Sequence, residues 1–302
     1  MRALVTGATG FIGRALVREL EAPVVLTRDL DRARRVLGPG VEAYRWDPRA
    51  GPPPAEALAD VSQVFHLAGE PVAAGRWTHA RKERILESRV RGTRSLVGAL
   101  EALRQRPRVL VSASAVGYYG DRGEEILEET SPPGDGFLTE VTLAWEAEAN
   151  RAATLGIRVV TPRIGIVLGL GGGALARMLL PFKLGLGGRL GDGRQWMPWV
   201  HLDDLVGLLR HGAAGSEIAG PMNAVSPAPV TNREFTKALA TALGRPAIFP
   251  APRAMLRLVF GEMALVLLAS QRVLPRVALA TGYQFRYPTL AEAFRALLGA
   301  KA

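Results

Sequence analysis

Three glycines near the N-terminus, Gly7, Gly10 and Gly13, have the spacing of a turn that can bind a pyrophosphate. They follow the apolar run 3–5 and precede residues 14–20, whose apolar positions repeat at helical spacing. In a strand–turn–helix unit, such glycines allow a tight turn, a close approach of the backbone to the diphosphate, and close packing of helix on sheet. The diphosphate lies at the positive end of the helix. We therefore expect a dinucleotide as ligand, the alternative being a packed turn without one.

The end of the second apolar run distinguishes NADP from NAD. A ribose with a free 2′-hydroxyl is usually held there by Asp or Glu, whereas a 2′-phosphate is held by Arg. The run 24–27 is followed by Arg28, whose guanidinium can bind phosphate in a bidentate manner. Asp29 and Asp31 could argue for NAD, but both stand where the next helix needs a cap. We therefore expect NADP(H) as the cofactor.

Strands and helices alternate over the first half of the chain. The predicted strands are 3–5, 24–27, 61–67, 109–112 and 157–160, and the predicted helices are 14–20, 30–37, 78–104 and 139–155. This alternation predicts an α/β fold of the Rossmann type, with a doubly wound parallel sheet and right-handed crossovers.

The regular alternation ends near Arg163. Beyond it, Gly-rich and Pro-rich segments separate short helices, which predicts a smaller, mostly helical substrate-side domain. We assign residues 1–165 to an NADP-binding Rossmann domain, to which 200–224 returns, and residues 166–302 to the second domain. The apolar stretch from Met255 to Leu274 is interrupted by charged residues, so we expect a pair of buried helices there.

Composition excludes several classes of protein. Of the 302 residues, 48% are hydrophobic and 22% charged, as in ordinary globular proteins. The longest stretch without Asp, Glu, Lys or Arg, 218–232, contains prolines and is too short for a membrane span. The first residues resemble no signal peptide, so we expect a cytoplasmic protein. The chain has no cysteine, and its four histidines lack zinc-ligand spacing, so we do not expect metal chemistry.

The formal net charge of +10 comes mainly from arginines that are interleaved with acidic residues. Because the charge is not clustered, we expect neither nucleic acid nor a membrane surface as partner. The excess does suit a small ligand that carries phosphate.

Several motifs resemble the extended short-chain dehydrogenase/reductase superfamily, to which the nucleotide-sugar epimerases belong. They are the glycine turn 6–13, the segment 66–69 after one predicted strand, and 112–114 after the next. Four longer segments resemble one poorly characterised epimerase-like subfamily with its own C-terminal domain, namely 75–78, 114–120, 195–204 and 261–283. The resemblance covers essentially the whole chain and implies the same Rossmann fold.

The resemblance also implies positions around the cofactor. It assigns the pyrophosphate to residues of the glycine turn: Thr6, Gly7, Gly10, Phe11, Ile12 and Gly13. It places the adenine-side ribose beside Leu67 and Ala68, and the nicotinamide-side ribose beside Ser112 and Ala113. It places Arg28 at the 2′-phosphate and Asp47 near the adenine, although Asp47 could equally form only a turn before Pro48.

The chain departs from the superfamily at the catalytic pair. Relatives carry a Tyr followed one helical turn later by a Lys, which together exchange a proton with the substrate. The equivalent residues here are Phe137 and Val141, so this relay cannot operate. Candidate replacements are Ser114, Tyr118 and Tyr119, but both tyrosines could instead pack with their hydroxyls bonded to backbone.

Other polar residues have structural alternatives. Glu140 could act as a base but fits a solvated helix, while His66, His201 and Asp203 fit residues that brace loops. Four tryptophans on segments expected to face the substrate could stack on a planar or sugar-like group, or could lie in the core: Trp77, Trp145, Trp196 and Trp199. Three arginines could meet an anion, namely Arg76, Arg81 and Arg163. These residues favour an aromatic or anionic small-molecule substrate.

These observations favour an NADPH-dependent oxidoreductase acting on an unknown small molecule. A non-catalytic NADP(H)-binding regulator is the alternative, because the catalytic pair is missing, and a nucleotide-sugar epimerase ranks third. Analogy with the fold predicts a homodimer through the helices at 78–104 and 139–155.

Overall fold

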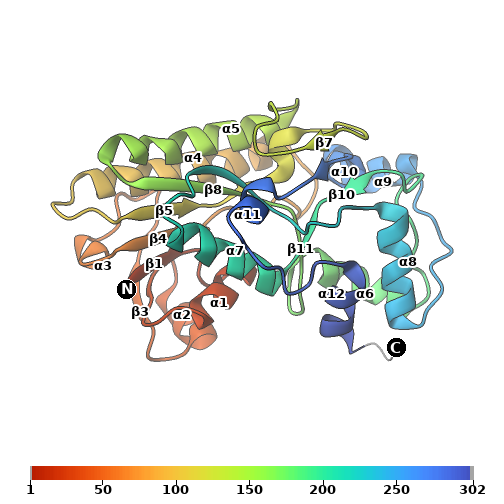
Figure 1. Ribbon diagram of the computed structural model, residues 1–302, viewed down its shortest axis with the longest axis horizontal. Helices are drawn as coiled ribbons and strands as arrows, with labels where there is room; N and C mark the ends of the chain where they lie inside the picture. Colours follow the sequence, from red (N-terminus) through yellow and green to blue (C-terminus); the bar gives the residue numbers. More distant parts are fainter. Residues whose placement is uncertain (1, 300–302) are drawn as a thin grey trace.

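A parallel sheet forms the centre of the N-terminal part in this computed structural model, which describes residues 2–299 (Figure 1). Residues 1 and 300–302, at the outer ends of the two predicted domains, lie outside the described part. The order of strands in the sheet is β3–β2–β1–β4–β5–β8–β12, and β6 also pairs with β8. These strands are β1 (Ala3–Thr6), β2 (Val24–Thr27), β3 (Glu42–Arg45), β4 (Gln63–His66), β5 (Val109–Ser112), β6 (Ser114–Ala115), β8 (Arg158–Ile164) and β12 (Gly220–Ala224). The doubly wound α/β fold predicted from the sequence is confirmed.

Helices cover both faces of the sheet (Figure 1). The first face carries α1 (Phe11–Arg18), α2 (Leu30–Leu37) and α7 (Leu202–Ala214), and the second carries α3 (Ala55–Leu58), α4 (His79–Glu101) and α5 (Phe137–Asn150). Leu16 and Leu208 belong to the core on the first face, and Leu96 and Ala149 to the core on the second. Because both faces are covered, the central strands are continuous apolar runs.

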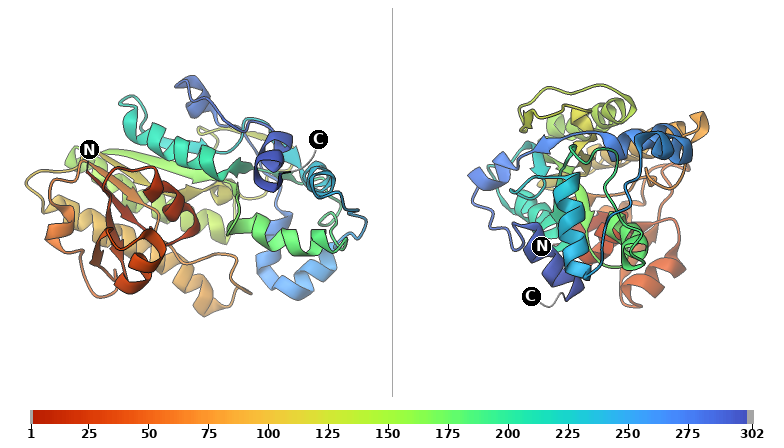
Figure 2. Two further views of the ribbon diagram at one scale, coloured as in Figure 1. Left: turned by 90° about the horizontal axis from the view of Figure 1, so that it is seen from below. Right: turned by 90° about the vertical axis from the view of Figure 1, so that its right-hand side faces the viewer.

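The C-terminal part is mostly helical and lies at the opposite end of the molecule from the N-terminus (Figure 2). Its helices are α6 (Gly173–Lys183), α8 (Asn232–Leu243), α9 (Arg253–Phe260), α10 (Ala264–Leu268) and α12 (Leu290–Leu298). The short helix α11 (Arg276–Ala280) lies between α10 and α12 in the sequence but packs against β12 of the main sheet. Three pairs of short strands accompany them: β9 (Ile166–Leu168) with β11 (Trp199–His201), β10 (Trp196–Met197) with β13 (Val230–Thr231), and β7 (Ile126–Leu127) with β14 (Arg272–Val273). Capping boxes begin α8 and α12, where Thr231 pairs with Glu234 and Thr289 with Glu292.

The chain crosses between the two parts more than once. After β9 and α6 in the C-terminal part, it returns through α7 and β12, and β12 pairs with β8 of the main sheet. The β7–β14 pair joins residues 126–127 to residues 272–273. The two parts are therefore interlaced rather than consecutive.

The expectation of a buried helix pair between Met255 and Leu274 is wrong. Two short helices form there, but Met255 is 53%, Leu258 77% and Leu265 51% exposed. Only one side of each helix faces the small cluster that contains Leu256 and Leu268. No neighbouring element of the described chain covers the opposite side, so these apolar side chains face solvent. Within residues 2–299, none of the helices combines the length and apolar character that a bilayer crossing needs.

Candidate functional site

The candidate site begins where β1 and β4 end side by side. The chain runs outward from β1 through β2 and β3 on one side, and from β4 to β5 on the other. The carboxyl ends of β1 and β4 therefore meet at the switch point of the sheet, where open α/β sheets bind ligands.

Thr6 and His66 join the ends of these two strands. Oγ1 of Thr6 lies 2.7 Å from Nδ1 of His66 and accepts a 3.2 Å hydrogen bond from the amide of Ala68. Nε2 of His66 lies 3.1 Å from the hydroxyl of Thr93 on α4. Burial lowers the pKa of His66 to about 4, so its ring is neutral near pH 7. As predicted, His66 braces the loop that follows β4.

The glycine turn is closed too tightly for side chains. Gly7 has φ +69°, and a Cβ there would lie 2.8 Å from the carbonyl of Leu67. A Cβ on Gly13 would lie 2.3 Å from the carbonyl oxygen of Gly7, and one on Gly10 would lie 3.1 Å from the same atom. Gly10 is the N-cap of α1, which has neither a side-chain cap nor an acidic residue in its first turn. The first amides of α1 are therefore available to an anion.

Phe11 connects this turn to the C-terminal part. Cβ atoms added to Gly169, Gly172 and Gly173 would lie 2.8, 2.6 and 2.9 Å from its ring. The Gly-rich segment after β9 thus lies directly on the ring, and Ile12 packs against the core beside it. A side chain at Gly169, Gly172 or Gly173 would collide with the aromatic ring, which explains the glycine at these three positions.

Charged residues at the end of β2 have separate environments. Arg28 is exposed, and within the described chain no group bonds or pairs with its guanidinium. The carboxylate of Asp29 accepts a 2.9 Å hydrogen bond from the amide of Arg32 and caps α2, as predicted. Asp31 lies 3.9 Å from Arg34 in an exposed ion pair. The acidic residue nearest β2 is therefore engaged by the backbone, whereas Arg28 is free.

The predicted ribose neighbours follow β4 and β5. Leu67 and Ala68 are partly buried, while Ser112 and Ala113 are buried at the neighbouring strand end. The amide of Ala113 donates a 2.9 Å hydrogen bond to the carbonyl of His66. The hydroxyl of Ser112 is buried, and the described residues offer it no hydrogen-bond partner. An unsatisfied buried hydroxyl at this point suits a site that is completed by a ligand or water.

Asp47 lies on an exposed turn beyond β3. Its carboxylate accepts a 3.0 Å hydrogen bond from the amide of Arg49, and its carbonyl accepts one from Ala50. Both hydrogen bonds lie within the turn, so they fit the structural alternative that the sequence left open for Asp47.

Ser114 and Tyr119, two of the predicted catalytic residues, belong to a buried polar network. The Ser114 hydroxyl donates to Oε1 of Glu146 at 2.6 Å, and Nε and Nη2 of Arg163 bind the two oxygens of the same carboxylate at 2.9 and 3.0 Å. The hydroxyl of Tyr119 lies 2.7 Å from Oδ1 of Asn223 and accepts a hydrogen bond from Arg163 at 3.1 Å. Burial raises the pKa of Tyr119 to about 12. These contacts favour a structural role for Tyr119.

Tyr118, the third candidate, has a different environment. It is partly buried, and its ring lies 3.4 Å from the guanidinium carbon of Arg163. Its hydroxyl has no hydrogen-bond partner among residues 2–299. Of the three candidates, Tyr118 therefore keeps a phenol that is free to bind a ligand.

Phe137 and Val141 stand where relatives carry the catalytic pair. Val141 is 2% exposed and packs in the interior. The ring of Phe137 lies edge-on to Trp77, with centroids 5.1 Å apart, and the ammonium of Lys82 lies 4.9 Å from its centroid. Lys82 in turn forms a 2.6 Å ion pair with Glu262 of the C-terminal part. No exchangeable proton is available on either side chain of the altered pair.

The tryptophans divide into different environments. Trp199 is 1% exposed and donates to the carbonyl of Ala228, so it belongs to the core. Trp145 is also buried, but its indole Nε1 has no partner in the described chain. Trp77 and Trp196 are partly buried and donate to Val72 and Glu124.

The three arginines expected to meet an anion already contact protein acceptors. Arg163 binds Glu146, Arg76 donates to the carbonyl of Leu258, and Arg81 donates to that of Pro71. His201 is also occupied, because its Nδ1 caps α7 by accepting the amide of Asp203.

Sequence reasoning gave no role to Arg89 of α4. Its Nη1 donates to the carbonyls of Glu70 and Ile85, both at 3.1 Å, and its guanidinium lies 4.9 Å from the ring of Trp145. A signal was present, since position 89 lies one turn from Ile85 and from Thr93 on the buried stripe of the helix. A charged side chain on the buried stripe of a helix indicates that the residue makes a specific polar contact.

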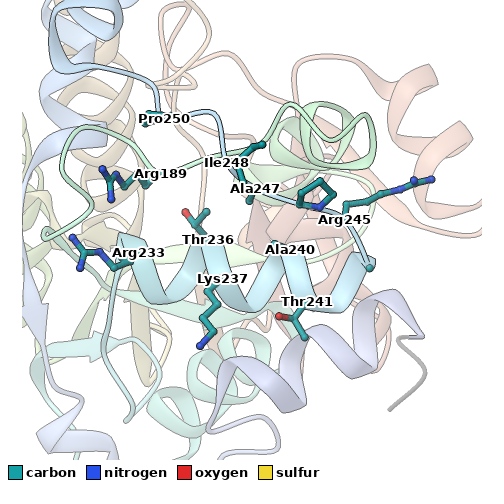
Figure 3. A pocket seen from close by; sticks show the side chains of 12 residues that line it. Arg189, Arg233, Thr236, Lys237, Ala240, Thr241, Arg245, Ala247, Ile248 and Pro250 are labelled. Atoms are coloured by element: carbon teal, nitrogen blue, oxygen red, sulfur yellow. The ribbon is translucent and has the colours of Figure 1, made fainter.

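A pocket of about 630 Å³ lies elsewhere, between α8 and residues 244–250 (Figure 3). Arg189 and Arg233 extend toward the same end of it, whereas Lys237 and Arg245 point in other directions. None of its lining residues belongs to the glycine turn. In the described part of the chain, no cluster of His, Asp and Glu is arranged to hold a metal ion.

Comparison with known proteins gives consistent matches over the whole chain. The model of the NAD dependent epimerase/dehydratase family matches residues 3–215, and a domain of unknown function, DUF1731, matches residues 251–297. Epimerase family protein SDR39U1 of Bos taurus is 41% identical, with 99% of this chain and 100% of that protein covered. Epimerase family protein YfhF of Bacillus subtilis is 35% identical, with 99% and 98% covered. The crystal structure of human epimerase family protein SDR39U1 (isoform 2) with NADPH has a TM-score of 0.87, 38% identity and 99% coverage of both chains.

Proposed function

Because this chain belongs to the NAD dependent epimerase/dehydratase family, we propose that it binds NADP(H) at the switch point between β1 and β4 and acts as an oxidoreductase on a small molecule. The proposal depends mainly on the different environments of the acidic and the basic residue that follow β2. Asp29 is used as a helix cap, and Arg28 is left without a protein partner in the described chain. This arrangement suits a 2′-phosphate better than a 2′-hydroxyl.

The residues present fit such a cofactor. The glycine turn has no side chain that could obstruct a close approach of its backbone to a diphosphate, and the N-terminus of α1 is not capped by a side chain. Among the residues that the structure describes, the buried hydroxyl of Ser112 at the end of β5 has no hydrogen-bond partner. The turn would hold the pyrophosphate, Arg28 the 2′-phosphate, and Ser112 the nicotinamide-side ribose. Human SDR39U1, a relative of similar length, was crystallised with NADPH.

When bound, the cofactor supplies or accepts a hydride, and the chain must then provide or remove a proton. Phe137 cannot do so, and the proton of Ser114 is directed to Glu146. Tyr118 has a hydroxyl without a protein partner in the described structure, and it follows the strand end that carries Ser112. We therefore assign the proton transfer to Tyr118.

A titration with NADPH and NADH, read by tryptophan quenching, tests the cofactor assignment. We expect NADPH to bind at least about tenfold more tightly, and Arg28→Ala to remove this preference while leaving NADH affinity unchanged. Arg104→Ala is the control. Arg104 is also exposed, but it precedes β5 and so lies on the side of the amino ends of the strands, away from the proposed site. Failure of the wild-type protein to bind either nucleotide would contradict the proposal.

A non-catalytic NADP(H)-binding regulator is the second candidate, favoured by the absence of the catalytic pair at Phe137 and Val141. A panel of carbonyl compounds with stereospecifically deuterated NADPH separates the two functions. Transfer of deuterium to any compound excludes the regulator. Tight cofactor binding with no transfer to any member of a broad panel argues for it.

A further inference from the structure

The pocket between α8 and residues 244–250 is lined by cations and by no acidic residue (Figure 3). Its volume of about 630 Å³ is in the range of cavities that hold small organic ligands. The charged lining residues are Arg189, Arg233, Lys237 and Arg245. A cavity with charge of one sign attracts ligands of the opposite sign, so the pocket suits a small anion.

Arg189 and Arg233 are held beside each other at one end of the pocket. Gly193, with φ +74°, lies against both stems: a Cβ there would lie 3.3 Å from Cβ of Arg189 and 3.3 Å from Cβ of Arg233. Both guanidinium groups extend toward the same end of the pocket (Figure 3). Two like charges in such positions repel each other, and an anion bound between them replaces that repulsion by attraction.

The acidic residues nearby do not neutralise these two arginines. The carboxylate of Asp192 forms a 3.5 Å ion pair with Arg253, and that of Glu234 belongs to the capping box of α8. Arg233 donates only to the backbone carbonyl of Asp192, at 3.4 Å. In the described chain, the guanidinium of Arg189 has no partner. Both side chains therefore keep donors for a ligand.

Thr236 adds a buried hydroxyl to the same end of the pocket. It follows Arg233 by three residues on α8, so the two share one face of the helix. Thr236 is only 7% exposed, and none of the residues 2–299 forms a hydrogen bond with its hydroxyl. Figure 3 shows this hydroxyl pointing from α8 toward the end where the two arginines extend. Because buried hydroxyls normally have a partner, this one indicates a ligand.

The next part of the pocket along α8 is apolar. Ala240 lies one helical turn after Thr236, and Ala247 lies opposite it on the segment that follows the helix (Figure 3). Lys237 and Arg245 point in other directions. An uncharged organic group can therefore lie against the two alanines while an anionic group contacts the arginines.

We propose that this pocket binds a small organic molecule that carries a phosphate group. The phosphate lies between Arg189, Arg233 and the hydroxyl of Thr236, and the organic part lies against the apolar wall. Donors from three side chains suit a tetrahedral group with three terminal oxygens, and arginine binds phosphate through its planar fork. The pocket shares no lining residue with the glycine turn or with Arg28, so it is a second ligand site, separate from the proposed NADP(H) site.

Calorimetric titration of the full chain with phenyl phosphate tests the site. NADPH is present in excess, so that the probe cannot occupy the proposed cofactor site. We expect one molecule of phenyl phosphate to bind, more tightly than inorganic phosphate, which has no organic part. Arg189→Met and Arg233→Met should each weaken binding by about tenfold. Arg295→Met is the matched control, expected to change the affinity by less than about twofold. Arg295 is an exposed arginine of α12 that does not line the pocket.

The buried hydroxyl has its own variant. Thr236→Val keeps the shape of the side chain, so we expect an unchanged midpoint of thermal unfolding and an affinity for phenyl phosphate lowered by about threefold or more. Arg233→Lys should retain part of the affinity that Arg233→Met loses, because it keeps the charge without the planar fork.

Three results would overturn the inference. One is the absence of binding of phenyl phosphate at millimolar concentration. Another is an equal loss of affinity in Arg295→Met and in the pocket variants, since that pattern shows attraction by net charge alone. The third is displacement of the probe by NADPH, which places the probe in the cofactor site. If the protein binds no NADPH at all, the proposed function fails, and the pocket variants still decide this inference.

Discussion

The hydroxyl of Ser114 donates a 2.6 Å hydrogen bond to Glu146, although the two residues lie on different elements, β6 and α5. The same carboxylate binds Arg163 on β8 through both of its oxygens. The side chains of Arg163 and Glu146 are 4% and 10% exposed, so the pair is buried. Since a hydroxyl has one proton, Ser114 in this arrangement offers only lone pairs to a ligand. The network joins α5 to β6 and β8.

Glu146→Gln should strongly destabilise the fold. The substitution leaves the buried guanidinium of Arg163 without its carboxylate, which typically costs about 3–5 kcal/mol. The matched control is Glu148→Gln on the same helix, where the carboxylate binds two exposed arginines, Arg94 and Arg151. We expect the control to lose about 1 kcal/mol or less. Urea unfolding measures both, and equal losses would contradict the assigned role of the buried pair.

Gly13→Ala should disrupt the glycine turn. The new Cβ would lie 2.3 Å from the carbonyl oxygen of Gly7, so the backbone of the turn must move. We expect a loss of about 1–3 kcal/mol in stability together with loss of NADPH affinity. Gly98→Ala is the control, because a Cβ there has open space on α4 and should stabilise the helix by up to about 1 kcal/mol. Thermal unfolding and nucleotide titration of the two variants are the measurements, and similar behaviour of both would refute the packing argument.

His66 should make the fold less stable in acid. Its pKa is about 4 in the folded protein against 6.5 for a free side chain, because burial disfavours the charged ring. The unfolded chain therefore binds more protons between these values. The stabilising contribution is complete above pH 6.5 and is lost as the pH falls toward 4, by about 3 kcal/mol in total. In urea unfolding as a function of pH, His66→Gln should have a smaller slope than wild type across this window. Identical slopes would show that His66 does not titrate as described.

Asp204→Asn should loosen the segment that follows α11. The carboxylate of Asp204 is fully buried and accepts hydrogen bonds from the amides of Arg286 at 2.7 Å and Tyr287 at 2.9 Å. An amide side chain can accept only one of them and presents a donor to the other, so we expect a loss of about 2–4 kcal/mol. The neighbouring Asp203→Asn should cost about 1 kcal/mol or less, because its side chain is 49% exposed. Hydrogen exchange at residues 283–287 locates the effect, and unchanged protection there would contradict it.

Local patterns made the central sheet predictable from the sequence. Runs such as 109–112 are apolar throughout because helices cover both faces of the sheet, and the glycines of the turn stand at a fixed place between strand and helix. The cap at Asp29 could be recognised for the same reason, since its partner amide lies only three residues away. Each of these features depends on neighbours in the sequence.

The features that the sequence did not predict depend on distant partners. Ser114 and Glu146 are 32 residues apart, and nothing local indicates that the serine proton is already engaged. The guanidinium of Arg89 reaches Gly69 and Trp145 only because α4 and α5 pack side by side. The apolar residues of α9 suggested a buried helix, but burial requires a covering element, and none covers Leu258 in the described chain. The hydrophobic pattern predicts that a helix forms, but whether its apolar side is buried depends on the tertiary fold.

The return of β12 to the main sheet limits how this protein can be divided or recombined. A fragment that ends at residue 165 would lack both α7 and β12, and β8 would become an open edge with unpaired backbone groups. Such edges pair with other chains, so the fragment should self-associate. A chimera that exchanges the helical part with that of a relative therefore needs three junctions, one after β8, one before α7 and one after β12. The α7–β12 segment then stays with the sheet to which it belongs.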